Sequence, residues 1–319
     1  MSATLTWASS GAGTKTGTTV ATLITDMVTL INSKSGDSTF SWQVASSNTA
    51  SSPNYIVLKR KDGSAGRILL AVWTSAPAGN NAAILDGAPS SNSVYCAWFP
   101  SGNVDTPSNL TASSGTIMGD DSNCVKVSAA LAVATIYATG IVPFYFDSAE
   151  AVIFCWQNPS NTTCYACGAG SLLVDASDNA YGATFGMQAF SFAASNMTWA
   201  NTKPLANSTT ACFRTNYGSA DRTYFQAWNP TGVWASSAVS STDILTDTGA
   251  NKAWFVPVQL LGQTKGEGFV LKVRQMAIGP GTLGPLTAYN TTGPVVQARQ
   301  ANIATVGGNG LLWLTNFKL

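Results

Sequence analysis

The sequence predicts an all-β fold, an antiparallel sandwich or barrel-like structure with one amphipathic helix near its N-terminus. Short runs of aromatic and β-branched residues recur along the 319-residue chain, separated by Gly, Pro, Asn, Asp and Ser, which is typical of strands and turns. Helical and strand patterns do not alternate, so a doubly wound α/β sheet is not expected. One early segment has the residue spacing of a helix.

The predicted helix covers residues 18–33. Threonine is frequent in it, and because β-branched residues lose side-chain freedom in a helix, its stability has to come from tertiary packing. The Ser-Lys-Ser-Gly run at 33–36 ends it. The apolar residues at three-and-four spacing are Val20, Leu23, Ile24, Met27, Leu30 and Ile31.

Two of the predicted strands, 55–60 and 67–73, form a hairpin. Their connection contains Asp62, Gly63 and Gly66, residue types that tolerate the positive φ of a tight reversal. Further strands are predicted at 41–45, 94–99, 129–138, 151–157, 171–174, 189–192, 211–214, 223–228, 253–261, 268–276 and 311–317.

The best candidate for a domain boundary is the Ser-, Gly- and Asp-rich stretch at 102–123, which is equally compatible with an extended loop or arm. It divides the chain into a helix and hairpin region at 1–101, the loop or arm at 102–123, and a β-rich region at 124–319. The first and last regions are also compatible with one continuous domain.

The composition indicates a neutral, hydroxyl-rich surface. Only 10% of the residues are charged, compared with about 25% in an average protein, and the net charge is +1. Little charge repulsion keeps copies apart, so self-association into a homo-oligomer is expected. No nucleic-acid partner is expected, because phosphate binding needs clustered basic residues. The densest basic cluster, Lys59, Arg60, Lys61 and Arg67, flanks the hairpin turn and is interpreted as a solvated loop.

No export signal or membrane contact is expected from the sequence. The first residues lack the basic and apolar regions of a secretory signal, and no apolar run reaches the roughly 20 residues needed to cross a bilayer. The six cysteines are too sparse for a disulfide-stapled fold, so we expect mostly reduced thiols and synthesis in the cytoplasm.

The chain contains no histidine, which removes Ser-His-Asp and Cys-His catalysis and the zinc sites that depend on His. A carboxylate pair remains possible for sugar hydrolysis, with Asp147 and Glu150 as the best local grouping beside Asp120 and Asp121. Solvated carboxylates at loops and strand starts are the more economical interpretation. We therefore expect no enzyme and no catalytic residues.

Cys164 and Cys167, with Cys155 nine residues before Cys164, are weak candidates for a zinc site or a redox pair. A second Cys-x-x-Cys is absent and the other thiols are scattered, so packed thiols or a local disulfide are favoured. No metal and no cofactor are expected.

Tryptophan is frequent for a chain of this size. Exposed Trp rings stack on sugars, and a row of them would suit a glycan-binding module. Most of these Trp residues fall inside apolar segments, which favours packing in the core or between subunits. They are Trp7, Trp42, Trp73, Trp98, Trp156, Trp199, Trp228, Trp234, Trp254 and Trp313.

Segments near both ends of the chain resemble a group of virion proteins of tailed bacteriophages. The resemblance covers about a third of the chain as a general pattern and implies a particle component with no enzymatic site. The segments that carry it are LTWASSG at 5–11, LINS at 30–33, YIVLKRKDG at 55–63, GRILL at 66–70, APAGNN at 76–81, RQMAIGPG at 274–281 and WLTNF at 313–317.

These observations lead us to expect a structural component of a tailed-phage virion, made in the host cytoplasm and assembled in many copies in the tail or baseplate. Its partners would be copies of itself and other virion proteins. A capsid decoration protein and a receptor- or glycan-binding module are the alternatives, and a carboxylate-dependent glycan hydrolase is a third.

Overall fold

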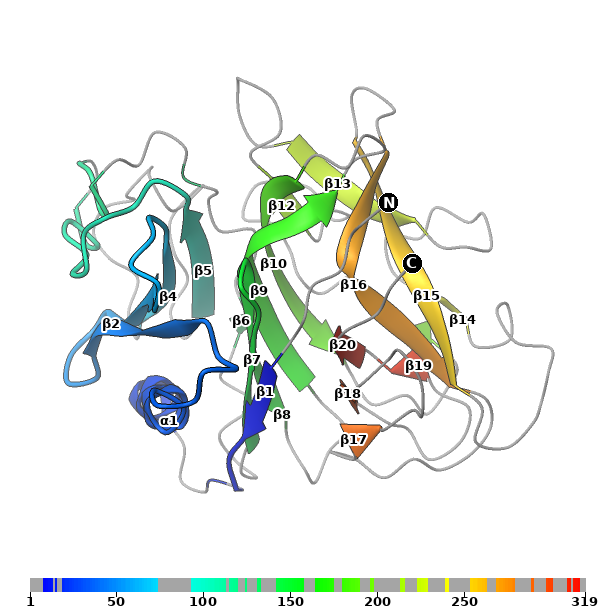
Figure 1. The fold of residues 1–319 in the computed structure, drawn as a ribbon, viewed down its shortest axis with the longest axis horizontal. Coiled ribbons are helices and arrows are strands. Elements are labelled where there is room, and N and C mark those ends of the chain that lie inside the picture. Colours follow the sequence, from blue (N-terminus) through cyan, green and yellow to red (C-terminus); the bar gives the residue numbers. More distant parts are fainter. Residues whose placement is uncertain are drawn as a thin grey trace.

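The fold is taken from a computed structural model of the chain (Figure 1). Its described part is mostly antiparallel β-sheet with one α-helix, which agrees within these residues with the predicted β-rich class and the predicted N-terminal helix. The structure describes residues 8–13, 15, 19–73, 93–112, 115–119, 124, 131–132, 142–157, 164–174, 180–189, 196–197, 213–215, 223–228, 239–240, 253–262, 268–278, 288–289, 297–300, 309–310 and 312–315.

Helix α1 (Val20–Asn32) begins after a threonine capping box. The backbone N–H of Thr22 donates to Thr19 Oγ1 at 3.3 Å, and the Thr19 N–H donates to Thr22 Oγ1 at 2.6 Å. The hydroxyls of Thr25 and Thr29 donate to carbonyl oxygens one turn earlier, which satisfies these side chains inside the helix. The apolar face is buried, as the periodicity predicts, through Leu23, Ile24, Met27, Leu30 and Ile31.

A five-stranded antiparallel sheet follows the helix, in the order β2-β3-β4-β5-β6. The predicted hairpin is present as β3 and β4, and the turn between them places Gly63 at φ 79° and Gly66 at φ 116°. The predicted strand at 129–138 is described at β6 alone. The bounds are β2 (Trp42–Asn48), β3 (Asn54–Arg60), β4 (Arg67–Trp73), β5 (Ser93–Phe99) and β6 (Leu131–Ala132).

Both faces of this sheet are covered, and all seven residues of β4 are buried. This explains why apolar residues follow one another from Ile68 to Trp73 without alternating with polar ones. On one face Ile68, Leu70 and Val72 pack in a core with α1. On the other face Leu69 and Trp73 pack in a second core.

The second core is closed by a segment that we call the strap, residues 102–112 and 115–119. It contributes Leu110, Ile117 and Met118, each at most 7% exposed, to the face of the sheet that α1 does not cover. The described part of the 102–123 stretch therefore packs against its own sheet. The division of the chain into three regions stays a prediction.

A larger antiparallel sheet has the strand order β1-β7-β8-β9-β10-β12-β13-β15-β16-β19, and β9 also pairs with β16. Its strands are β1 (Ala8–Gly11), β7 (Val142–Asp147), β8 (Ala151–Gln157), β9 (Cys164–Val174), β10 (Ala180–Ala189), β12 (Phe213–Thr215), β13 (Thr223–Trp228), β15 (Ala253–Gly262), β16 (Gly268–Ile278) and β19 (Asn309–Gly310). Two small sheets contain β11 (Asn196–Met197) with β14 (Val239–Ser240), and β17 (Ala288–Tyr289) with β18 (Gln297–Gln300) and β20 (Leu312–Thr315).

Strand β9 changes its partner along one edge. It pairs with β8 as far as Gly170, which lies opposite Ala151, and pairs with β16 at Leu173 and Val174. Gly170 has φ 130°, and the Ser171 N–H donates to the Glu150 carbonyl oxygen at 3.0 Å. A glycine fits this point because the backbone of β8 approaches it closely and other residues avoid this φ.

The two large sheets share one hydrophobic core. Residues of α1, β2 to β5 and β7 to β9 belong to the same buried cluster, in which Trp42, Trp98 and Trp156 are at most 7% exposed. Figure 1 shows α1 and the five-stranded sheet beside β7, β8 and β9. Segments more than 100 residues apart in the chain therefore depend on each other for burial.

Candidate functional site

The two sheets meet at a buried carboxylate, Asp147, at the end of β7. Its side chain is fully buried. The backbone N–H of Ser41 donates to Oδ1 at 2.7 Å, and the N–H of Trp42 donates to Oδ2 at 3.0 Å. The Tyr145 hydroxyl donates to Oδ2 at 2.7 Å. Asp147 thus joins the start of β2 to the end of β7 by hydrogen bonds to both carboxylate oxygens.

Burial raises the pKa of Asp147 from 3.8 to about 6. Hydrogen bonds from Ser41, Tyr145 and Trp42 and the positive charge of Lys61 favour the ionised form, but they offset the burial only in part. The same burial, together with the adjacent Asp147 carboxylate, raises the pKa of the Tyr145 hydroxyl well above 10.0. Tyr145 therefore stays a neutral hydrogen-bond donor.

The turn between β7 and β8 is fixed by Ser148. Its N–H donates to the Ala151 carbonyl at 2.9 Å, and its hydroxyl donates to the same oxygen at 3.0 Å. The Ser148 carbonyl accepts from Trp42 Nε1 at 2.8 Å, so the turn is also attached to β2. The Asp147 carboxylate and the turn at Ser148 together attach the two sheets to each other.

Asp147 and Glu150 were the sequence's best candidates for a catalytic carboxylate pair. Asp147 lines no described pocket and uses both oxygens in structural hydrogen bonds, whereas a general acid has to reach the proton it transfers. Glu150 is half-buried at the following turn. The role of Asp147 as a link was not predictable, because its partners Ser41 and Trp42 lie 106 and 105 residues earlier in the chain.

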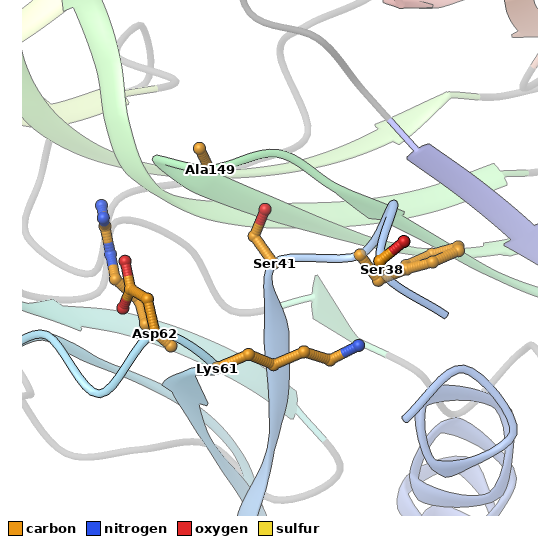
Figure 2. A pocket seen from close by; sticks show the side chains of 7 residues that line it. Ser38, Ser41, Lys61, Asp62 and Ala149 are labelled. Atoms are coloured by element: carbon orange, nitrogen blue, oxygen red, sulfur yellow. The ribbon is translucent and has the colours of Figure 1, made fainter. Parts of the chain in front are cut away.

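A pocket of about 380 Å³ opens beside this junction (Figure 2). Three separate segments build it: residues 38–41 before β2, residues 60–62 at the start of the hairpin turn, and the turn after β7. In Figure 2 the Ser41 side chain extends toward Ala149, while the Lys61 ammonium lies on the other side of β2 from Asp62. The lining residues are Ser38, Phe40, Ser41, Arg60, Lys61, Asp62 and Ala149.

The charged residues of the pocket differ in how they are engaged. Lys61 Nζ donates to the carbonyl oxygens of Lys34 and Asp37, at 3.0 and 2.8 Å. Asp62 accepts from the hydroxyl and backbone N–H of Ser64, which lowers the pKa of the Asp62 carboxyl. Arg60 lies over the Trp42 ring, with Cζ 5.3 Å from the centroid.

The four basic residues predicted to form one solvated cluster do not do so. Arg67 is 9% exposed, and its Nη2 lies 2.8 Å from Asp105 Oδ1. Lys59 Nζ lies 2.6 Å from Asp105 Oδ2. The solvated-loop interpretation is therefore wrong for Arg67, because a carboxylate of the strap neutralises it on the sheet. Of the four, Arg60 and Lys61 reach the pocket.

Replacing Asp105 should loosen the strap. The D105N variant loses charge-assisted hydrogen bonds to Lys59 and Arg67, and we expect a loss of about 1–2 kcal/mol in unfolding free energy, a value reduced because Asp105 is partly exposed. Urea unfolding followed by tryptophan fluorescence measures it. The matched control is D62N, which removes the same charge from an exposed carboxylate that bonds within its own turn. Equal stability of the two variants would show that Asp105 does not hold the strap.

The three candidate metal cysteines lie on two adjacent strands. Cys155 pairs with Ala166, and Cys164 pairs with Gln157, in one uninterrupted register. Cys164 and Cys167 lie three residues apart in β9. Cys167 is buried in the shared core. Within the described residues, no three His, Cys, Asp or Glu side chains gather as metal ligands would.

Four tryptophans have described side chains, and all four are buried. Trp42, Trp73 and Trp156 are at most 1% exposed, and Trp98 is 7% exposed. These four rings serve packing and are closed to a sugar ligand. The side chains of the other six lie outside the described part of the structure.

No helix in the described residues has the length and apolar character of a membrane span.

The chain was compared with protein families, curated proteins and solved structures. No protein family, no curated protein and no solved structure matches this chain.

Proposed function

We propose that the chain is a structural subunit of a tailed-phage virion that assembles in multiple copies, in the tail or baseplate. The observation that carries the assembly part is the charge content: 10% charged residues and a net charge of +1 leave a surface with little repulsion between copies. The phage part is supported by the resemblance of the terminal segments to virion proteins. Capsid decoration is the alternative position in the particle.

The use of side chains in the described region is consistent with a building block. Buried Trp rings, the Asp147 junction and the strap all contribute to holding the two sheets together. Among the described residues, Val104 is the large hydrophobic residue that stands exposed, at 39%. Contacts between subunits through this region would therefore be polar and uncharged, as at the rim of many interfaces.

We also propose that strands of the larger sheet close into a barrel-like ring. Strands β9, β10, β12, β13, β15 and β16 are linked in a ring of pairings, because β16 pairs back to β9. A closed ring removes exposed strand edges and gives a rigid unit for repeated packing.

The native mass tests the proposal. Size exclusion with light scattering should give an integer multiple of 33.1 kDa above one, and electron microscopy should show rings or tubes. Because the proposed contacts carry little charge, the mass should not change between about 0.1 and 1 M NaCl, although the Debye length falls from about 10 to 3 Å. A monomer at every concentration that also joins no particle would refute the proposal, and dissociation by salt would refute neutral contacts.

A further inference from the structure

The pocket beside Asp147 contains Arg60, for which no described carboxylate forms a direct ion pair, although its charge, after the hydrogen bonds from Ser64, helps to lower the pKa of Asp62. In the described part of the chain the Arg60 guanidinium makes no hydrogen bond or ion pair, and its Nε is buried without a partner. Lys59, its neighbour in the sequence, and Arg67, which lies opposite Lys59 on β4, are both paired with Asp105. Stacking on Trp42 holds the Arg60 group in place but supplies no hydrogen-bond acceptor.

Two serine hydroxyls line the same pocket, and neither forms a hydrogen bond with another described residue. The Ser41 backbone is fixed, because its N–H donates to Asp147 at 2.7 Å, and this leaves the hydroxyl at the pocket. Figure 2 shows the side chains of Ser38 and Ser41 beside it. A guanidinium and two hydroxyl donors that line one pocket can together bind an oxyanion.

The charge of the pocket favours an oxyanion with a single negative charge. The Lys61 ammonium donates to two carbonyl oxygens and keeps its charge, so Arg60 and Lys61 against Asp62 give the lining a net charge of +1. Asp62 adds a carboxylate at the exposed rim. A phosphate group, with a charge of about −1.5 to −2, exceeds this net charge, whereas the single charge of a carboxylate group matches it and pairs with one guanidinium.

The size of the pocket and its polar groups are compatible with a hydroxylated ligand. About 380 Å³ is within the range of small-molecule sites and larger than a carboxylate group needs. Besides Arg60, the polar groups at hand are the two serine hydroxyls and the Asp62 carboxylate, which together donate to and accept from hydroxyl groups.

We propose that this pocket binds a carboxylated sugar of the uronic acid class, with Arg60 pairing with the sugar carboxylate and Ser38, Ser41 and Asp62 bonding to its hydroxyls. This activity goes beyond the structural role and does not depend on it. Its site uses none of the buried tryptophan faces, which separates it from a stacking-type sugar site.

Saturation-transfer NMR with galacturonic acid and galactose tests the proposal, because the two sugars differ in the carboxylate at one carbon. A monosaccharide of this size in an open pocket should bind with a Kd of about 1 mM. Galactose should bind at least about tenfold more weakly, since it lacks the charge-assisted pair.

Two variants, R60Q and S41A, test which residues bind the sugar. R60Q should weaken galacturonic acid binding by about tenfold or more, and S41A by about two- to fivefold while keeping the backbone bond to Asp147. The matched control K34Q removes a nearby positive charge that does not line the pocket, and its binding should equal that of the unchanged protein. Thermal unfolding of each variant checks that the fold is kept, and S41A decides the matter if R60Q unfolds.

Equal binding of galactose and galacturonic acid, or full binding by both R60Q and S41A, would overturn the proposal. Acetate or inorganic phosphate that competes as well as the acidic sugar would also overturn it, because the pocket would then recognise a bare anion.

Discussion

Substituting alanine for Gly170 should cost the protein about 3–5 kcal/mol of unfolding free energy. A Cβ at this position would lie 2.4 Å from the Glu150 carbonyl oxygen and 2.5 Å from the Ala151 Cα, both backbone atoms that cannot move aside alone. The φ of 130° adds backbone strain for any side chain. The strand pair β8–β9 has to separate to accept the methyl group, which disrupts the point where β9 changes partner.

Chemical denaturation of G170A beside G36A measures this effect. Gly36 is exposed and has no positive φ, and a methyl group added there would meet nothing within 4 Å, so G36A tests the loss of a glycine alone. G36A should lie close to the unchanged protein. A G170A protein as stable as G36A would show that β8 and β9 do not approach as closely as described.

The second large effect is expected at Asp147. D147N should lower the unfolding free energy by about 2–4 kcal/mol, because the amide places an NH₂ group against a backbone N–H of Ser41 or Trp42 and leaves a buried donor unpaired. The exposed D37N is the control for the same chemical change. If D147N and D37N unfold at the same denaturant concentration, the carboxylate does not join the two sheets.

The raised pKa of Asp147 makes the unfolding free energy depend on pH. The carboxyl titrates at about 6 when folded and near 3.8 when unfolded, so the folded state binds the proton more readily between these values. The stability that this provides is complete below pH 3.8 and is lost as the pH rises through 6. Unfolding free energy should therefore increase by up to about 3 kcal/mol as pH falls from about 7 to about 4.

D147N should lack this rise, while D37N should keep it. The hydroxyl of a protonated Asp147 can turn its proton away from the backbone N–H, whereas the NH₂ group of an asparagine cannot. Protonation of Asp147 should therefore raise the unfolding free energy, and the D147N substitution should lower it. At lower pH the sign reverses, because the pKa values of Asp105, Asp37 and Asp62 lie below the ordinary value and protonation removes their contribution. A rise of equal size in D147N would assign the titration to another group.

The parts of the fold that could be predicted are those in which local pattern and burial agree. The periodicity of 18–33 and the apolar runs of β3 and β4 are strong signals, and the turn residues Gly63 and Gly66 identify the hairpin. Strand β7 was not predicted, because Pro143 falls within it and proline is unfavourable in strands. The first half of β9 is rich in small residues, so it lacks the usual strand composition.

The candidate site was predictable only in part. Arg60 and Lys61 stand out as a basic run, but their separate roles depend on Trp42, Asp37 and Lys34, which local sequence does not connect to them. Ser38 and Ser41 carry no signal of their own in a serine-rich chain. Tertiary contact between three segments creates the pocket, and a single sequence holds no record of such contacts.

The pairing of β1 with β7 cannot form until β7 has been synthesised. Ala8 lies opposite Asp147, so one of the first strands to emerge waits for a partner translated much later. Until that partner arrives, α1 and the five-stranded sheet have no β7 to cover the core that they share with it. The nascent chain thus passes through a stage in which an apolar face is open to water, and rapid translation or a bound chaperone would shorten or protect that stage.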